Sequence, residues 1–369
     1  MKNLYVLFIP ICILAASGYI RQKETIDSLK QSDLMNEKTS KTDTILKMGN
    51  NSIILLVNLK GGAYIDFHLK ELPVNPISWR LGHFVCFDRW GYPSAAKKAN
   101  GFLIHGEAKT EMWDLLNAPH LINSRPASSI MCTLPMAGLQ LTRKIELSAD
   151  EPVFFVTEEI KNLNKNGRMF NIVQHVTIAP PFLDKSTLFD NNTLQGFEDR
   201  NDGSLNQDDI VLKWSQADHN GEKVTLRQFE VAWPKVSSFM FGENEKYGWV
   251  TACNAEKNIM LGYLWETKEY PWINFWRSMD NGIPKAFGME FGTTGLNEPF
   301  PVVAKKGKIF GQNIYDFIDA GEVISKSFTA FLAKIPADYK GVERIDVNNY
   351  RFVIKEKCRT SRDITYLMK

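Results

Sequence analysis

Hydrophobic and polar residues alternate with a period of two along much of the chain. In residues 139–147 every odd position except Arg143 is leucine or isoleucine, and every even position is polar. This is the period of a half-buried β-strand, whose successive side chains point to opposite faces. Similar strand-like runs occupy residues 53–58, 63–69, 152–161, 169–178, 258–266 and 323–334, whereas helical spacing is weak except in residues 107–117. The pattern predicts an all-β fold, and the even composition along the chain favours one large antiparallel β-sandwich.

Composition narrows the class of partner. The 369 residues include 44 Lys and Arg against 42 Asp and Glu, a formal net charge of +2. Such a balance argues against a nucleic-acid partner held by bulk charge. Hydrophobic residues make up 44% of the chain, which is enough to bury a core, and aromatic residues make up 12%. Aromatic rings suit both half-buried strands and the flat faces of sugars.

The N-terminal segment has the pattern of an export signal. Lys2 precedes a short apolar run that ends in small residues near Ser17. A secretory signal peptide has this form, whereas a membrane-spanning helix needs about 20 apolar residues. We therefore expect a periplasmic or secreted protein, with membrane contact only through this segment if it stays uncleaved. The expected organisation is a signal peptide in residues 1–17, a polar tether in 18–48, a sandwich domain in 49–337 and a C-terminal extension in 338–369.

The motifs of several enzyme classes are missing. The sequence has no phosphate-binding loop, no GxSxG nucleophile elbow and no HExxH zinc helix. Four cysteines follow the signal, at positions 86, 132, 253 and 358, without the C-x-x-C spacing of a metal or redox site. Disulfide bridges and single buried thiols are equally compatible with their spacing.

Two strand-like runs carry the candidate catalytic residues. In residues 169–178 Phe170, Ile172, Val176 and Ile178 share one face, and His175 lies on the other, less apolar face with Asn171, Val173 and Thr177. In residues 286–292 three large apolar side chains share one face, and Glu290 lies opposite, between Gly288 and Gly292. These glycines would leave room for a ligand beside the carboxylate. A solvent-facing glutamate on an edge strand is the alternative.

An aromatic run offers a surface for a sugar. Residues 270–277 contain four aromatic rings in eight positions. Such rings stack on the C–H face of sugars, so Trp272 and Trp276 are candidate substrate-binding residues. The alternative is a core strand in which the rings are buried.

These residues resemble, in order and context, those of the galactose mutarotase (aldose 1-epimerase) superfamily. The similarity rests on His105 in a His-Gly dipeptide, His175 about 70 residues later in a strand, and Glu290 in a Met-Glu-Phe-Gly-Thr run. It covers roughly residues 50–335 and implies a large antiparallel β-sandwich. By position it implies that His175 is the general acid and Glu290 the general base, while His105 and Arg89 hold the sugar. It implies no metal and no organic cofactor.

The chain departs from the superfamily pattern at two points, which suggests a distant branch. Glu107 follows the His-Gly dipeptide where a second glycine is usual, and Met-Glu-Phe-Gly replaces the usual Leu-Glu-Thr-Gln around the base.

Three functions fit these residues. The first is a mutarotase-like isomerase acting on a small-molecule carbohydrate, with an acid and a base on opposite sides of the sugar ring. The second is a carbohydrate-binding protein without turnover. The two differ in whether His175 and Glu290 face each other across a pocket that admits a pyranose ring. The third is a glycosidase or lyase on the same sandwich. A glycosidase needs a second carboxylate either about 5 Å or about 6.5 to 9.5 Å from the first. The candidates for that carboxylate are Asp88, Glu107, Asp184 and Glu298.

Overall fold

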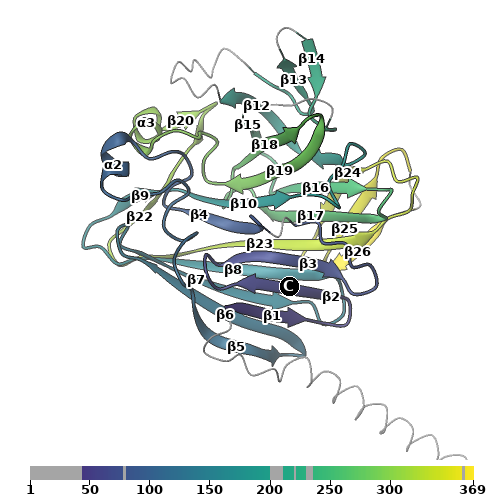
Figure 1. Cartoon of the computed structure of the whole chain (residues 1–369), viewed down its shortest axis with the longest axis horizontal. Helices are drawn as coiled ribbons and strands as arrows, with labels where there is room; N and C mark the ends of the chain where they lie inside the picture. The colour runs from purple at the N-terminus through teal and green to yellow at the C-terminus, as the bar shows by residue number, and fades with distance from the viewer. Residues whose placement is uncertain (1–43, 78–79, 200–210, 220–221, 230–235, 360–361) are drawn as a thin grey trace, which may run out of the picture. The chain divides into compact units, whose positions relative to one another are not determined.

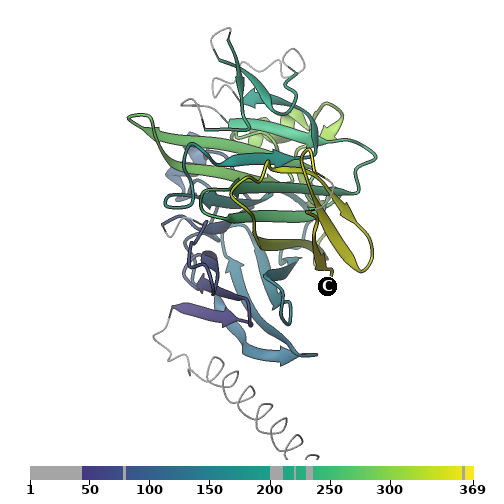
Figure 2. The same ribbon diagram turned by 90° about the vertical axis from the view of Figure 1, so that its right-hand side faces the viewer.

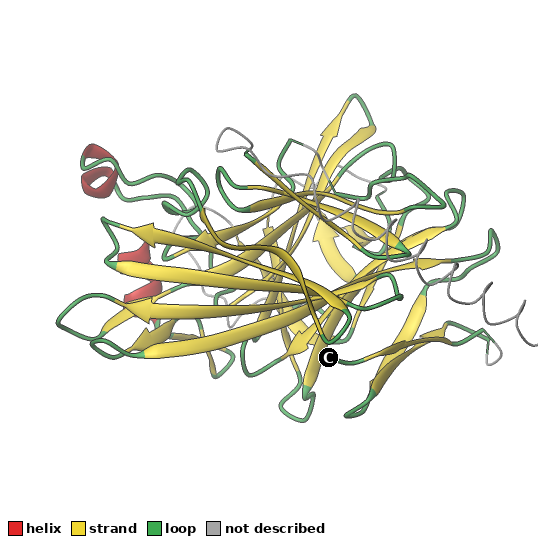
Figure 3. Cartoon of the chain, turned by 90° about the horizontal axis from the view of Figure 1, so that it is seen from below, coloured by secondary structure: helices red, strands yellow, loops and turns green. Residues whose placement is uncertain are grey.

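Almost all regular structure in the described part of the chain is β-strand (Figure 3). The computed structural model describes residues 44–77, 80–199, 211–219, 222–229, 236–359 and 362–369. Within these ranges there are two short helices, α2 (Ala95–Ala99) and α3 (Phe300–Lys306). All strand pairs in the two large sheets are antiparallel. The predicted all-β sandwich is confirmed.

The first sheet has nine strands and begins and ends with segments far apart in sequence. In spatial order they are β1 (Ile45–Gly49), β2 (Ile53–Asn58), β3 (Ala63–Leu69), β4 (His83–Phe87), β10 (Ile172–Ile178), β19 (Ile283–Gly292), β18 (Trp272–Asp280), β15 (Val236–Phe241) and β12 (Thr193–Asp199). Long connections therefore bring β4, β10 and β19 together at the centre of the sheet (Figure 1).

The second sheet has eight strands. In spatial order they are β11 (Leu188–Asn191), β16 (Tyr247–Asn254), β17 (Ile259–Glu266), β23 (Val323–Lys334), β8 (Val153–Asn162), β7 (Leu139–Leu147), β6 (Arg125–Leu134) and β5 (Asp114–Ile122). Its apolar face packs on that of the first sheet, and one core cluster contains Leu55 and Phe291 from the first sheet with Leu141 and Leu261 from the second. The sandwich core therefore lies between the two sheets.

Smaller sheets complete the described structure. They pair β13 (Gln216–His219) with β14 (Glu222–Thr225), β20 (Lys308–Ile309) with β21 (Gln312–Asn313), and β22 (Asp316–Ile318) with β9 (Arg168–Phe170). A three-stranded sheet contains β24 (Val342–Val347), β25 (Arg351–Glu356) and β26 (Ile364–Leu367).

Arg143, the one charged residue on the apolar face of β7, has its ion-pair and hydrogen-bond partners inside the core. Arg143 is fully buried, and its Nη2 lies 2.7 Å from Oε1 of the equally buried Glu158. The guanidinium also lies 4.7 Å from the ring of Trp113, and Gln174 donates a hydrogen bond to Glu158 at 2.6 Å. A buried charge is tolerated only when it is paired and hydrogen-bonded, as it is here.

The limits of the folded unit differ from those expected. Strand β1 begins at Ile45, so residues 45–48 belong to the first sheet and not to the tether. The C-terminal residues 338–369 contain β24–β26, which pack on the outer face of the eight-stranded sheet through Phe352 and Ile354 (Figure 2). Residues 44–369 thus form a single unit. The expected signal peptide and the rest of the tether lie outside the described residues.

Three further expectations can be compared with the described residues. The segment 107–117 is not helical, because turns lead directly into β5. Cys86, Cys132 and Cys253 are buried and Cys358 is exposed, and none of these four forms a disulfide. The helices found in the described ranges are all too short or too polar to cross a lipid bilayer.

Candidate active site

Three neighbouring strands place Phe84, His175 and Glu290 side by side. His175 in β10 is the register partner of Phe84 in β4 and of Glu290 in β19. Residues directly opposite each other in antiparallel strands project to the same face. That face points away from the main core, because the alternating residues Val176 and Met289 belong to the core cluster. The predicted orientation of His175 and Glu290 away from their apolar neighbours is confirmed.

His175 and Glu290 form a buried pair. The distance from His175 Nε2 to Glu290 Oε1 is 3.0 Å, and the two side chains are 6% and 1% exposed. The indole N–H of Trp90 donates to Glu290 Oε2 at 2.7 Å, and His175 Nδ1 lies 3.1 Å from Thr177 Oγ1. Each carboxylate oxygen and each ring nitrogen of the pair therefore has a partner within the protein.

The placement of the pair corrects one expectation. His175 and Glu290 lie next to each other on adjacent strands, and no pyranose ring fits between two groups 3.0 Å apart. The expected arrangement on opposite sides of a sugar ring is wrong, because cross-strand register partners are close neighbours.

The loop after β4 brings His105 to the same pair. His105 and Gly106 have φ angles of 68° and 79°, and a Cβ atom on Gly106 would lie 2.1 Å from the carbonyl oxygen of Phe87. Only glycine allows this close approach of the loop to the end of β4. The His105 ring centroid consequently lies 5.1 Å from that of His175.

The hydrogen bonding of His105 fixes its tautomer. Its Nδ1 lies 2.9 Å from the carbonyl oxygen of Trp90. Because a carbonyl only accepts, Nδ1 carries the hydrogen. Burial, followed by electrostatic interaction with His175 and Lys109, lowers the pKa of His105 to about 3. At neutral pH the ring is uncharged, and its Nε2 is a hydrogen-bond acceptor.

A cavity of about 260 Å³ opens over the pair. The described residues that line it are Leu81, Phe84, Trp90, Tyr92, Ile104, His105, Lys109, His175, Val236, Trp276, Glu290 and Asn297. Most ligand pockets combine apolar walls with a few convergent polar groups, and this cavity has that composition. Of the candidates named from sequence, it brings together His105, His175, Trp276 and Glu290.

Trp276 occupies the space that the neighbouring glycine leaves open. A Cβ atom on Gly288 would lie 2.0 Å from Trp276 Nε1, so the indole rests directly on this glycine. The ring centroid of Trp276 lies 5.9 Å from that of His175. At Gly292 a Cβ atom would meet the carbonyl oxygen of Ile172 at 2.6 Å. We expected the glycines beside Glu290 to leave room for a ligand. They instead make room for protein atoms.

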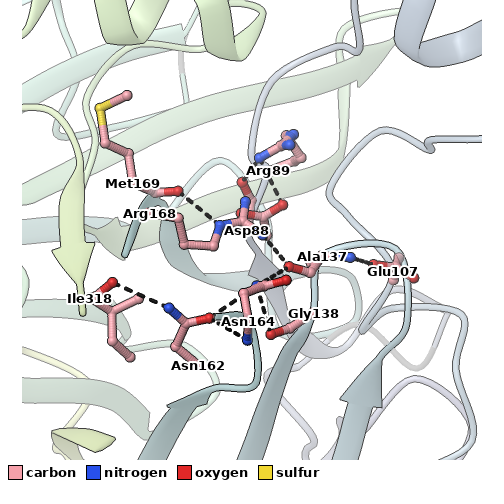
Figure 4. Close-up of polar contacts among 10 residues, drawn as sticks. All are labelled: Asp88, Arg89, Glu107, Ala137, Gly138, Asn162, Asn164, Arg168, Met169 and Ile318. Atoms are coloured by element: carbon pink, nitrogen blue, oxygen red, sulfur yellow. Dashed lines mark hydrogen bonds and ion pairs between the residues drawn. The ribbon is translucent and has the colours of Figure 1, made fainter. Parts of the chain in front are cut away.

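Arg89 does not line the cavity. Its Nη1 lies 2.7 Å from Asp88 Oδ2, and its guanidinium lies over the ring of Phe300 at 4.5 Å. Asp88, buried and with a φ of 69°, also pairs with Arg168, which donates to the carbonyl oxygen of Ala137 (Figure 4). The predicted contact of Arg89 with sugar is corrected to a role in this ion cluster, because the backbone turns sharply after β4.

Glu107 has a structural role that explains its presence after the His-Gly dipeptide. Its two carboxylate oxygens accept hydrogen bonds from the backbone N–H groups of Met136 and Ala137 at 3.0 and 2.9 Å. Glu107 thereby fastens the loop that carries His105 to the turn between β6 and β7 (Figure 4).

Trp272 is also removed from the site. Its side chain is fully buried, and its indole N–H donates to the carbonyl oxygen of Asn313 at 2.8 Å. It packs with Leu296, Val303 and Ile314 in a separate apolar cluster. The predicted sugar-binding role is corrected to packing.

Sequence reasoning named four of the twelve described lining residues and missed the other eight, of which three bear most on the site. Phe84 stacks on His175 with ring centroids 4.3 Å apart, Trp90 binds Glu290, and Lys109 places its Nζ 5.2 Å from the Phe84 ring centroid. The segment that follows β4 was predicted correctly as part of the site. The prediction named Arg89 as its binding residue, whereas the next residue, Trp90, lines the cavity. Lys109 carries no local signal.

The number of carboxylates in the described lining bears on whether the cavity could hydrolyse a glycoside. Among the described residues that line it, Glu290 is the only carboxylate. A second carboxylate for glycoside hydrolysis is therefore not provided by Asp88, Glu107, Asp184 or Glu298 at this cavity. In the described ranges no group of three or more His, Cys, Asp or Glu side chains is placed to hold a metal ion.

The described chain has the galactose mutarotase-like fold. A galactose mutarotase-like protein from Clostridium acetobutylicum superimposes with a TM-score of 0.58 and 12% identity, covering 78% of this chain and 95% of the other. A galactose mutarotase related enzyme from Lactobacillus acidophilus gives a TM-score of 0.58 and 10% identity over 79% of this chain and 98% of the other.

A third structure, a galactose mutarotase-like protein from Lactobacillus casei, gives a TM-score of 0.56 and 10% identity, covering 78% of this chain and 100% of the other. No protein-family model and no curated protein sequence matches this chain. The resemblance seen in the sequence is thus confirmed at the level of the fold.

Proposed function

We propose that this protein is an exported, mutarotase-like isomerase that interconverts the anomers of a small sugar by acid–base catalysis at His175 and Glu290. The observation that carries the proposal is the buried His175–Glu290 pair, 3.0 Å apart, in the lining of a cavity of about 260 Å³. A buried acid–base pair in a cavity is a common arrangement at catalytic sites.

The side-by-side arrangement suits the reaction. Ring opening removes a proton from the anomeric hydroxyl and adds one to the ring oxygen, and both oxygens are bonded to the same carbon. A base and an acid that lie side by side can therefore reach both oxygens. In the proposed mechanism the Glu290 carboxylate accepts the hydroxyl proton. His175 reacts in its protonated imidazolium form: it turns from Glu290, donates its Nε2 proton to the ring oxygen and becomes neutral.

The proton transfers accompany cleavage of the bond between the anomeric carbon and the ring oxygen. The product is an open-chain aldehyde with a new hydroxyl group. Rotation about the adjacent carbon–carbon bond presents the other face of the aldehyde. The hydroxyl then attacks that face, its proton returns to His175, and Glu290 protonates the aldehyde oxygen. The reaction is balanced without a cofactor.

The other cavity residues would bind the sugar. The neutral His105 offers Nε2 as an acceptor for a sugar hydroxyl, and the Trp276 ring provides a face for stacking on C–H groups. The Trp276 Nε1–H has no hydrogen-bond partner among the described residues.

Two observations favour a second candidate function, a carbohydrate-binding protein without turnover. His175 and Glu290 do not face each other across a space that admits a pyranose ring, which is the feature expected from the sequence to separate an isomerase from a binding protein. Both nitrogens of His175 and both oxygens of Glu290 already have protein partners. Catalysis requires the contact between the two residues to be exchanged for contacts with the sugar, whereas binding does not.

The test is anomer exchange measured by saturation-transfer NMR and by polarimetry on freshly dissolved α-glucose and α-galactose. Glu290→Gln keeps the shape but cannot accept the proton, so we expect its rate to fall about 10²- to 10⁴-fold. Glu159→Gln is the matched control, because Glu159 is on the surface and paired with Lys144. An unchanged rate in Glu290→Gln would remove Glu290 from the mechanism. Sugar binding without acceleration would support the binding protein.

Export has its own test. Mass spectrometry of the protein recovered from the periplasm or the medium should show that residues 1–17 are removed. Recovery of the full chain in the cytoplasm alone would contradict export.

A further inference from the structure

Lys109 has no carboxylate partner in the described lining of the cavity. The lining carboxylate, Glu290, lies within hydrogen-bonding distance of His175 Nε2 and accepts from the Trp90 indole N–H. Lys109 also lines the cavity, and in the part of the chain that the structure describes no carboxylate forms an ion pair with it. Its Nζ lies 5.2 Å from the centroid of the Phe84 ring. Lys109 is thus a charged donor whose ammonium group is not in direct contact with any described carboxylate.

His105 also lines the cavity, but it contributes no positive charge at neutral pH. Because burial lowers the pKa of His105 to about 3, this ring adds no second cation at neutral pH. Its Nδ1–H is held by the Trp90 carbonyl, so its Nε2 accepts. Lys109 is therefore the one charged donor in the described lining that is available to a ligand's anionic group.

Lys109 and the acid–base pair share a neighbour in the cavity wall. The Phe84 ring stacks on His175 at 4.3 Å, and Lys109 Nζ lies 5.2 Å from the centroid of the same ring. Lys109, His175 and Glu290 line the same cavity, so one small ligand can contact all three.

We propose that the cavity selects a hexuronic acid, whose carboxylate pairs with Lys109 while its anomeric carbon lies at His175 and Glu290. This inference rests on the proposed function in taking the ligand to be a sugar. A carboxylate is favoured over a phosphate because a single ammonium compensates one negative charge, whereas phosphate sites usually use several donors or a bidentate arginine. In a hexuronic acid the carbon that bears the carboxylate and the anomeric carbon are both bonded to the ring oxygen, so the carboxylate can pair with Lys109 while the anomeric carbon lies at His175 and Glu290.

The test compares charged and neutral sugars on the full chain by isothermal titration at low salt, where charge pairing is least screened. The probes are D-glucuronate and D-galacturonate, their neutral counterparts D-glucose and D-galactose, and D-glucose 6-phosphate. A charge-assisted hydrogen bond predicts that the wild type binds a uronate about 10- to 100-fold more tightly than the matching neutral sugar.

Variants assign that preference to one side chain. Lys109→Met keeps most of the apolar stem and should remove the preference, while Lys109→Arg should retain part of it. Lys98→Met is the matched control, because Lys98 is exposed on α2 and does not line the cavity. Thermal melting of each variant shows whether it is folded, and the preference of the wild type provides a measurement that does not depend on any variant.

The outcomes separate this inference from the proposed function. Equal wild-type affinity for uronates and neutral sugars, no binding of either, or tighter binding of D-glucose 6-phosphate than of D-glucuronate overturns the inference, as does a preference that survives in Lys109→Met. Where neutral sugars bind, anomer exchange that is lost in Glu290→Gln would still uphold the proposed function, whereas no binding of either kind of sugar would contradict both. A uronate preference that depends on Lys109, without any anomer exchange, upholds the inference while the proposed catalysis fails.

Discussion

The contact between Gly288 and Trp276 offers a way to displace one wall of the cavity without touching His175 or Glu290. Gly288→Ala adds a methyl group in an ordinary strand conformation, so the backbone accepts it. The methyl carbon would lie 2.0 Å from Trp276 Nε1 and 2.2 Å from Cδ1, whereas ordinary van der Waals contact begins at 3.4 Å. The indole must therefore move by more than 1 Å.

The size of this displacement sets the expected effect. A misplacement of about 1 Å at a reacting site can lower the rate by about 10²-fold. Overpacking of this kind also lowers the free energy of unfolding by about 1 to 3 kcal/mol. We therefore expect Gly288→Ala to fold with reduced stability and to lose most of its sugar binding and anomer exchange.

The assay combines urea unfolding with NMR titration of the sugar that the wild type binds most tightly. Gly242→Ala is the matched control, because a Cβ atom there meets only Glu245 Cγ at 3.6 Å. The reasoning is refuted if Gly288→Ala binds and exchanges the sugar like the wild type. That result would mean that Trp276 has no part in the site.

Three further predictions concern the two tryptophans of β18, the Glu107 carboxylate and the His105 ring. Trp272→Ala should lower the free energy of unfolding by about 3 to 5 kcal/mol in denaturant titrations, whereas Trp276→Ala should mainly weaken sugar binding in NMR titrations; the reverse pattern would contradict the assignment of the two rings. Glu107→Ala leaves the backbone N–H groups of Met136 and Ala137 without their acceptor, and we expect a loss of about 1 to 3 kcal/mol in the same unfolding assay; unchanged stability would show that water replaces the carboxylate. The pKa of His105 is lowered to about 3 in the folded protein, whereas an unfolded histidine titrates near 6.5. As the pH falls below about 6.5, the unfolded chain therefore takes up a proton at His105 before the folded protein does. The free energy of unfolding then decreases by up to about 1.4 kcal/mol per pH unit until about pH 3. Urea unfolding at pH 7, 6 and 5 should show a shallower loss in His105→Asn than in the wild type, and identical slopes would contradict the shift.

Local patterning accounts for much of the fold. The alternation in residues 53–58, 63–69, 139–147 and 323–334 corresponds to strands β2, β3, β7 and β23 with the same bounds. Side chains on a strand alternate between faces whatever the strand's neighbours are. For this reason the sequence alone also determined that His175 and Glu290 point away from their apolar neighbours.

The helical spacing of residues 107–117 shows where local patterning fails. Glu107 and the residues after it form turns that lead into β5, and the Glu107 carboxylate accepts hydrogen bonds from two backbone N–H groups of a distant turn. Such long-range contacts override a weak local preference.

The composition of the site was decided by tertiary structure. Trp272 and Trp276 lie on the same strand with the same parity, so they share a face of the sheet. Trp272 is covered by Leu296, Val303 and Ile314, whereas Trp276 lines the cavity, and only the path of a later segment makes this distinction.

Register and loop path decided the rest. His175 pairs with Phe84 and with Glu290 on neighbouring strands that are far apart in sequence. No local sequence pattern could therefore predict the 3.0 Å contact between His175 and Glu290. Lys109 and Trp90 enter the cavity because Gly106 lets the loop press against the end of β4. The sequence alone determined which strands form and which faces their side chains take, since these depend on neighbouring residues. Only the tertiary structure decided which of those side chains meet, because strand order and loop path depend on contacts across the whole chain.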